Sequence, residues 1–396
     1  MTSLNKVVLF LLLSGVFFSG SICMVEEWLH LTDIVLSISM LGILFMYLLN
    51  LKIDLEIPKV LSMIYFFFLL FIFISSLVNG SLQSLLSSFR YILIFITLSI
   101  VVPNLLKEKT LPISMGALIC SQIPLIVLSF TKQNPFIDIY GYGAYSGIFY
   151  NPNSYGLVVA TIFVVILGLY YEFIGSGRYG IQLLLLLSLF SLFLLTIFSS
   201  SRTSVTAIIF IIIMFLILYV IKNNGLKKIS IKRIRNIFLK CIASIFCIVI
   251  FIKSKYFNIF EGKILEKYIS KYNSGDVLDQ RGYIFSNTIS EAKLFGYGPD
   301  YFTKEFGIAA HNTFISILGQ FGLCASVLFL ILWMVLINKS IKFYFKSENR
   351  YSMLPVLIVT FFLLTSITEI MLMKTSMLLG MIIIGLIFVE SNYKRN

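Results

Sequence analysis

Charged residues are scarce in this chain. Only 12% of its 396 residues are Asp, Glu, Lys or Arg, whereas 59% are hydrophobic, and the mean hydropathy is +0.97. This composition excludes a soluble globular domain, in which about 25% of residues are charged. Apolar runs of about 20 residues recur along the chain, and each is long enough to cross a hydrocarbon core of ~30 Å.

Residue types that bind metals or support paired-carboxylate catalysis are also few. The chain has two histidines, 18 acidic residues and five cysteines, and every cysteine falls inside or at the edge of an apolar run. No cluster of these types has the spacing of metal ligands, so we expect neither a metal nor a cofactor. The scarcity of paired carboxylates disfavours a two-carboxylate hydrolase. The absence of a G-x-S-x-G motif likewise disfavours Ser-His-Asp catalysis.

The apolar runs predict helices, because lipid cannot satisfy backbone hydrogen bonds and a spanning helix satisfies its own. We therefore predict an all-α integral membrane protein, a bundle of about twelve transmembrane helices with a helical extracytoplasmic cap loop. No cleavage site follows the first apolar run, so we expect it to be retained rather than removed as a signal peptide. The predicted spans are 6–24, 29–50, 60–78, 85–104, 112–131, 155–173, 180–198, 203–221, 236–254, 311–337, 353–369 and 372–390.

The basic residues indicate how these spans are oriented. With the N-terminus in the cytoplasm, every short loop obeys the positive-inside rule, and the densest basic segments, 222–235 and 339–350, fall inside. The net charge of +13 is then mostly an orientation signal, and no nucleic-acid partner is expected. We predict a multi-pass protein of the bacterial cytoplasmic (inner) membrane with both termini in the cytoplasm.

The same alternation places two longer segments outside. Segment 132–154 is rich in Gly, Tyr, Asn and Pro, which predicts a loop with turns. Segment 255–310 is expected to form a small cap with short amphipathic helices in 263–274 and 279–295, and Asp279 is a candidate N-cap of the second. The predicted organisation is 1–254 for spans one to nine, 255–310 for the outer loop, and 311–396 for spans ten to twelve with a cytoplasmic tail.

Polar residues from separate parts of the chain gather at the outer face in this topology. Charged groups in or beside a span are costly and usually face the interior of the bundle or a wet cavity. The predicted group contains Arg90, Asn151, Asn153, Arg202, Arg281, His311, Asn312 and Glu369.

Two arginines and one histidine in this group suggest a specific chemistry. Arg202 follows a tight serine-rich turn and opens a helix, where backbone amides and a guanidinium together make an anion site. Arg281 begins a cap helix that leads through the turn 296–299 to His311, at the entry of a span. A histidine can be neutral near pH 7 and accept a proton. Such a set suits neutralising a departing diphosphate while a base activates a hydroxyl.

Each of these residues also has a simpler interpretation. Arg90 could be a snorkelling side chain near the headgroups, and Arg202 an ordinary interfacial arginine. His311 would be unremarkable as an interfacial histidine. Glu369 could orient a cation or a sugar hydroxyl, or it could be a helix-end charge paired with Lys374.

Three short motifs resemble one known family. Arg281 followed by LFGYGPDYF and then AHNTFISILGQFG resembles the signature region of the O-antigen ligase/polymerase (Wzy-type) membrane family. GIFYNPNSYG at 147–156 resembles that family's Gly-x-x-x-Asn-Pro-Asn entry to a span, and SSSRTS at 199–204 resembles its Ser-Arg-Ser/Thr turn. With the span count and the outer loop, the resemblance covers about three quarters of the chain.

The resemblance implies an integral-membrane glycosyltransferase that uses an undecaprenyl-diphosphate-linked donor and requires no metal. Carried over to this sequence, Arg202 and Arg281 bind the diphosphate and His311 orients or deprotonates the acceptor hydroxyl. Asn153 and Asn312 help to shape the site. The assignments of Arg90 and Glu369 to substrate binding rest on topology rather than on any motif.

The function expected first is a polymerase that joins undecaprenyl-diphosphate-linked repeat units of a capsule or O-antigen type polysaccharide. A ligase that transfers finished glycan to an acceptor uses the same chemistry, and the motifs barely separate the two. A flippase or transporter is the third reading, although transporters commonly show inverted repeats and broken mid-membrane helices. Expected partners are the lipid-linked oligosaccharide, membrane lipid, and a chain-length regulator and flippase of the same pathway.

Overall fold

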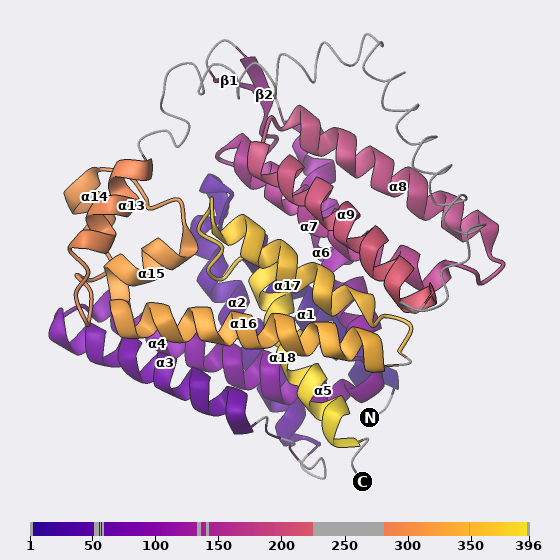
Figure 1. Cartoon of the computed structure of the whole chain (residues 1–396), viewed down its shortest axis with the longest axis horizontal. Coiled ribbons are helices and arrows are strands. Elements are labelled where there is room, and N and C mark those ends of the chain that lie inside the picture. The colour runs from indigo at the N-terminus through magenta and orange to yellow at the C-terminus, as the bar shows by residue number, and fades with distance from the viewer. Residues whose placement is uncertain are drawn as a thin grey trace.

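The computed structural model describes residues 3–50, 55, 57, 59–132, 136–139, 142–224, 281–347 and 349–393. This part of the chain is a bundle of long apolar helices (Figure 1). Eight stretches in it are long and apolar enough to cross a membrane, and two shorter apolar helices accompany them. The principal helices are α1 (Ser3–Ile22), α2 (Leu29–Leu48), α3 (Lys59–Val78), α4 (Leu82–Ile94), α6 (Thr110–Thr131), α7 (Pro152–Phe173), α8 (Tyr179–Phe198), α9 (Arg202–Asn224), α16 (Leu323–Lys346), α17 (Met353–Ser366) and α18 (Thr375–Tyr393).

The predicted multi-pass helical bundle is confirmed, and most predicted spans coincide with one helix. The fourth span departs in detail, since α4 continues through a π-helical stretch, Phe95–Val101, into the short α5 (Val102–Leu106). Span 236–254 lies outside the described residues, so the count of about twelve stays a prediction.

The prediction of one continuous tenth span over 311–337 is wrong. The structure divides it at Gly322 into α15 (Thr313–Phe321) and α16. Gly322 has φ of +92°, and a Cβ on it would come within 2.5 Å of the backbone of Leu294 and Gly296. Only glycine fits this left-handed, crowded position. The break therefore docks the Gly-Tyr-Gly turn directly onto the bundle.

Segment 132–154 contains more regular structure than the predicted loop. Strand β1 (Phe136–Ile139) pairs antiparallel with β2 (Tyr142–Tyr145), with Phe136 opposite Tyr145. The Tyr145 hydroxyl donates a hydrogen bond of 2.7 Å to the Ser129 carbonyl near the end of α6. A small hairpin is thus fixed to the helical bundle.

The cap is helical where the structure describes it. The predicted helix over 279–295 is present as α13 (Arg281–Ser290), and α14 (Tyr301–Phe306) follows the Gly-Tyr-Gly turn. Ile284, Phe302 and their apolar neighbours form a separate small core beneath these helices. The predicted first cap helix, 263–274, and the predicted N-cap Asp279 lie outside the described residues.

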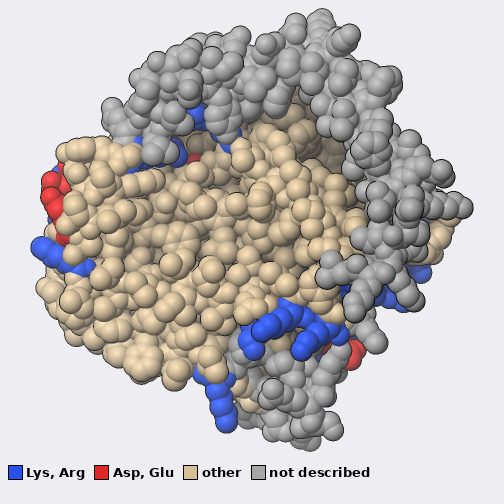
Figure 2. Space-filling view, viewed as in Figure 1, with Lys and Arg blue, Asp and Glu red and all other residues tan. Residues whose placement is uncertain are grey.

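Helices α7, α17 and α18 lie at the centre of the bundle, whereas α8 is mostly exposed at its edge. Both chain termini lie on the side where α16 ends, opposite the cap (Figure 1). The face in Figure 2 is a broad uncharged surface, with Lys, Arg, Asp and Glu side chains confined to its margins. This distribution is typical of a protein surrounded by lipid.

Candidate functional site

The loop between α17 and α18, residues 367–374, is where residues far apart in the sequence meet. The Asn312 side-chain amide donates to the Ile367 carbonyl at 2.9 Å, and the Thr313 hydroxyl donates to the Glu369 carbonyl at 2.9 Å. These bonds tie the entry of α15 to the 367–374 loop, and all three side chains of Asn312, Thr313 and Glu369 are largely buried. The loop is therefore held from within the bundle.

Arg281 and Thr203, the residue that follows Arg202, contact the same residue of this loop. Arg281 Nη1 donates to the Thr368 carbonyl at 3.1 Å. The Thr368 hydroxyl donates to the Thr203 hydroxyl at 2.9 Å, and Thr203 follows Arg202 in the first turn of α9. Within the described residues Arg281 makes this one hydrogen bond, and a guanidinium has five N–H donors, so donors are left for another ligand.

The Glu369 carboxylate lies between Asn153 and His311. Its Oε1 accepts a hydrogen bond of 3.2 Å from Asn153 Nδ2, and its Oε2 lies 3.8 Å from His311 Nδ1. The carboxylate side chain is 10% exposed, whereas the imidazole is 37% exposed. Within the described residues Glu369 has no ion pair with Lys374, the partner that the sequence allowed. The Nδ1 edge of the imidazole thus meets a buried carboxylate while the ring stays partly accessible.

His311 adopts an unusual backbone conformation. Its φ is +49°, in the left-handed region that few non-glycine residues occupy. The next residue, Asn312, caps α15 by accepting a hydrogen bond of 3.0 Å from the Ile315 amide. Strained positions of this kind persist only where the surroundings hold them, and they are frequent at functional sites. Here the Asn312 helix cap and the contact with Glu369 of the 367–374 loop together hold His311 in place.

The two shorter motifs pack against each other. Asn151 caps α7 by accepting a hydrogen bond of 2.8 Å from the Ser154 amide, and Pro152 follows at the first helical position. Gly156, one turn further, lies so close to the serine turn that a Cβ would come within 2.7 Å of the Ser199 and Ser201 side chains. The glycine in 147–156 therefore lets the turn before Arg202 approach α7.

Arg90 is placed elsewhere. Its Nη2 lies 2.7 Å from Asp33 Oδ2, and both side chains are exposed, at 39% and 53%. The pair joins α4 to α2, and nothing in the described residues connects it to the 367–374 loop. The structure thus brings Arg281, His311, Asn312, Asn153 and Glu369 together, with Arg202 one residue from Thr203, but not Arg90.

Three threonines in the site were not predicted. Thr203, Thr313 and Thr368 carry the hydrogen bonds that join α9, α15 and the 367–374 loop. Thr203 and Thr313 directly follow Arg202 and Asn312, which were predicted, so sequence adjacency was the available signal. In the described part of the chain no three His, Cys, Asp or Glu residues lie close enough together to hold a metal ion.

Comparison with known proteins agrees with the motifs. Residues 183–330 match the model of the Wzy_C family, described as O-antigen ligase. The match includes Arg202, Arg281, His311 and Asn312, whereas Asn153 and Glu369 lie outside it. No curated protein matches the chain. The chain is therefore a multi-pass membrane protein that carries a domain of the O-antigen ligase (Wzy_C) family.

Proposed function

We propose that the chain is a polysaccharide polymerase that joins undecaprenyl-diphosphate-linked repeat units on the outer face of the bacterial cytoplasmic membrane. The observation that supports this most is the convergence of Arg281, His311 and the start of α9 on the 367–374 loop. The family match supports action on a lipid-linked glycan. The concentration of basic residues at the opposite ends of the helices supports an outer location.

Arg281 and Arg202 bind the diphosphate in this proposal. Negative charge builds on the diphosphate as the bond between it and the sugar breaks, so fixed donors stabilise the transition state more than the ground state. Arg281 is held by Thr368 with donors left over, and Arg202 sits where the first amides of α9 also face an anion. Donors placed in this way contribute about 3–4 kcal/mol each in well-studied sites.

His311 takes the proton from the acceptor hydroxyl. The acceptor oxygen then forms the new bond to the sugar's anomeric carbon, and the diphosphate leaves with the electron pair of the bond that breaks. The proton rests on the imidazole, where the neighbouring Glu369 carboxylate stabilises the positive charge. Asn153 holds the other carboxylate oxygen and so keeps Glu369 oriented toward the ring.

A ligase is the second candidate, because the matching family model is described as O-antigen ligase. It would use the same arginines and histidine and differ only in its acceptor. A transporter has less support. Transporters commonly have helices that break in the middle of the membrane. The break at Gly322 lies instead at the cap end of the bundle, against the Gly-Tyr-Gly turn.

Reconstitution tests this proposal. Purified protein in vesicles is given defined undecaprenyl-diphosphate-linked repeat units and no nucleotide sugar, and products are separated by size. We expect a ladder of oligomers, and we expect His311→Ala to abolish it. The matched control is His30→Ala, which removes the other histidine, an exposed residue on α2. Transfer only to an added lipid acceptor would favour the ligase. No transfer to any acceptor, or a normal ladder from His311→Ala, would overturn the proposal.

A further inference from the structure

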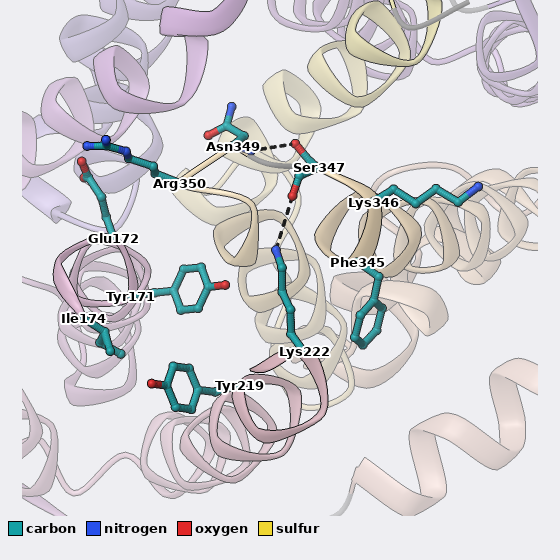
Figure 3. Close-up of a pocket in the computed structure, with 10 residues that line it drawn as sticks. All are labelled: Tyr171, Glu172, Ile174, Tyr219, Lys222, Phe345, Lys346, Ser347, Asn349 and Arg350. Carbon is teal, nitrogen blue, oxygen red and sulfur yellow. Dashed lines mark hydrogen bonds between the residues drawn. The ribbon is translucent and has the colours of Figure 1, made fainter. Parts of the chain in front are cut away.

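A cavity lies at the end of the bundle opposite the 367–374 loop. It has a volume of about 580 Å³ and is formed by the ends of α7, α9 and α16 and the loop that leads to α17 (Figure 3). Its volume falls within the range of about 300–1,000 Å³ of small-molecule sites. Polar and charged residues that line it include Tyr171, Glu172, Tyr219, Lys222, Lys346 and Arg350.

The helices that form this pocket also form the site at the 367–374 loop. Helix α7 carries Asn153 at one end and Tyr171 at the other, and α9 runs from Arg202 to Lys222. At 1.5 Å per residue these spacings correspond to about 30 Å, which is the thickness of the hydrocarbon core. The pocket therefore lies at the membrane face opposite the 367–374 loop, which is the cytoplasmic face in the predicted orientation.

Positive charge dominates the pocket. Among the lining residues that the structure describes, three are basic (Lys222, Lys346 and Arg350) and one is acidic (Glu172). Lys222 is fully engaged, because its Nζ lies 2.7 Å from the Tyr344 carbonyl, 3.4 Å from the Ser347 carbonyl and 3.2 Å from the Ser352 hydroxyl. It contributes charge to the pocket without a donor for a ligand.

Arg350 is the cation able to make direct contacts. It is exposed, and its side chain donates no hydrogen bond within the part of the chain that the structure describes. In Figure 3 its guanidinium extends toward the Glu172 side chain, while Lys346 extends outward at the rim. The hydroxyls of Tyr171 and Tyr219 add polar groups to the wall.

The helices that form the pocket expose apolar side chains. Leu216 and Ile217 on α9 are exposed, as are Ile341 and Phe345 on α16, and Phe345 lines the pocket itself together with Ile174. An amphiphile with a negatively charged head and hydrocarbon chains matches this combination, whereas a free phosphate ion would make no use of the apolar side chains. We propose that the pocket binds the phosphate headgroup of an anionic phospholipid of the inner leaflet, with Arg350 as its direct contact. Basic pockets between helices on the cytoplasmic side are suited to such headgroups.

Lipid retention by the full-length protein tests the proposal. The purified protein is placed in nanodiscs of phosphatidylcholine with a minor fraction of phosphatidylglycerol, and the phosphatidylglycerol retained is measured by native mass spectrometry. We expect Arg350→Gln to weaken retention about fivefold and the double variant with Lys346→Gln to weaken it further. The matched control is Lys342→Gln, which removes an exposed charge from α16, the helix that carries Lys346, outside the pocket and should leave retention unchanged.

A competition experiment distinguishes a lipid headgroup from free phosphate as the ligand. Inorganic phosphate should not displace the lipid or raise the melting temperature as phosphatidylglycerol does; an equal effect would replace the lipid site by a free-anion site. Equal retention by Arg350→Gln and Lys342→Gln would overturn the proposal. Should Arg350→Gln fail to fold in phosphatidylcholine alone, Arg350→Lys keeps the charge but loses the planar fork of donors. Unchanged retention with that variant would overturn Arg350 as the direct contact.

Discussion

The two ends of α7, α9 and α17 each use a cation to hold backbone carbonyls, but in different ways. At the pocket end, Lys222 donates to two carbonyls and a hydroxyl, which accounts for all three of its protons. At the 367–374 loop, Arg281 donates to one carbonyl among the described residues, that of Thr368, and keeps further donors. A saturated cation stabilises the fold, whereas an unsaturated one can bind a ligand. The number of hydrogen bonds that a cation makes thus distinguishes a cation that stabilises the fold from one that can bind a ligand. The net charge of the chain indicates only its orientation in the membrane.

The largest effect is expected at Arg281. Replacing Arg281 with Ala should lower the rate of chain elongation by about 100-fold or more, because a fixed donor to the leaving diphosphate is lost. Arg281→Lys should recover little, since lysine has three donors and one of them would be taken by Thr368. The rates are measured with the reconstituted protein and defined lipid-linked units.

A matched control for Arg281 is Lys293→Ala, which removes a cation that packs over the Tyr297 ring in the same cap. It should retain most activity. Full activity of Arg281→Lys would show that charge alone suffices, and the distinction between saturated and unsaturated cations would then fail.

A smaller loss is expected when the carboxylate beside His311 is changed. Glu369→Gln keeps the shape but removes the negative charge that stabilises the imidazolium, and should reduce the maximal rate by about 10-fold or more. Asn153→Ala, which only frees one carboxylate oxygen, should cost less. Both variants are expected to change the maximal rate and its pH profile while the KM for the donor changes little.

A rise in donor KM without a change in rate or pH profile would contradict this role for Glu369 and Asn153. It would instead favour direct substrate binding, which topology suggested for Glu369 and the family resemblance for Asn153. The two variants therefore test whether Glu369 and Asn153 position His311 or bind the substrate directly.

The sequence predicted most of the spans because apolar length is set by the membrane. It singled out several residues that lie together at the 367–374 loop because arginine and histidine are rare in such a chain. It missed the break at Gly322, since hydropathy does not register a backbone angle. It placed Arg90 in the site because topology shows how deep a residue lies in the membrane but not which way its side chain points. In the structure Arg90 pairs with Asp33, which is 57 positions away in the sequence. It missed Thr368 and Thr203 because a threonine acquires a role only from its tertiary partner.

At the pocket end, Lys222→Met should affect stability rather than activity. The variant keeps the apolar stem but leaves the Tyr344 and Ser347 carbonyls without their donor, which should lower the free energy of unfolding by about 1–3 kcal/mol. Melting of the detergent-solubilised protein measures this, and elongation per folded molecule should stay close to that of the unchanged protein. A large loss of activity at normal stability would mean that Lys222 is a ligand-binding cation after all.

The smallest effect is expected at Arg90. Its partner is Asp33 and both side chains are exposed, and such surface ion pairs contribute about 0–1 kcal/mol. Arg90→Gln should therefore change elongation less than twofold and the melting temperature only slightly, with Asp33→Asn behaving in the same way. If Arg90→Gln alone lost activity while Asp33→Asn did not, Arg90 would act on substrate independently of its ion pair. The set of unsaturated cations would then extend from the 367–374 loop to α4.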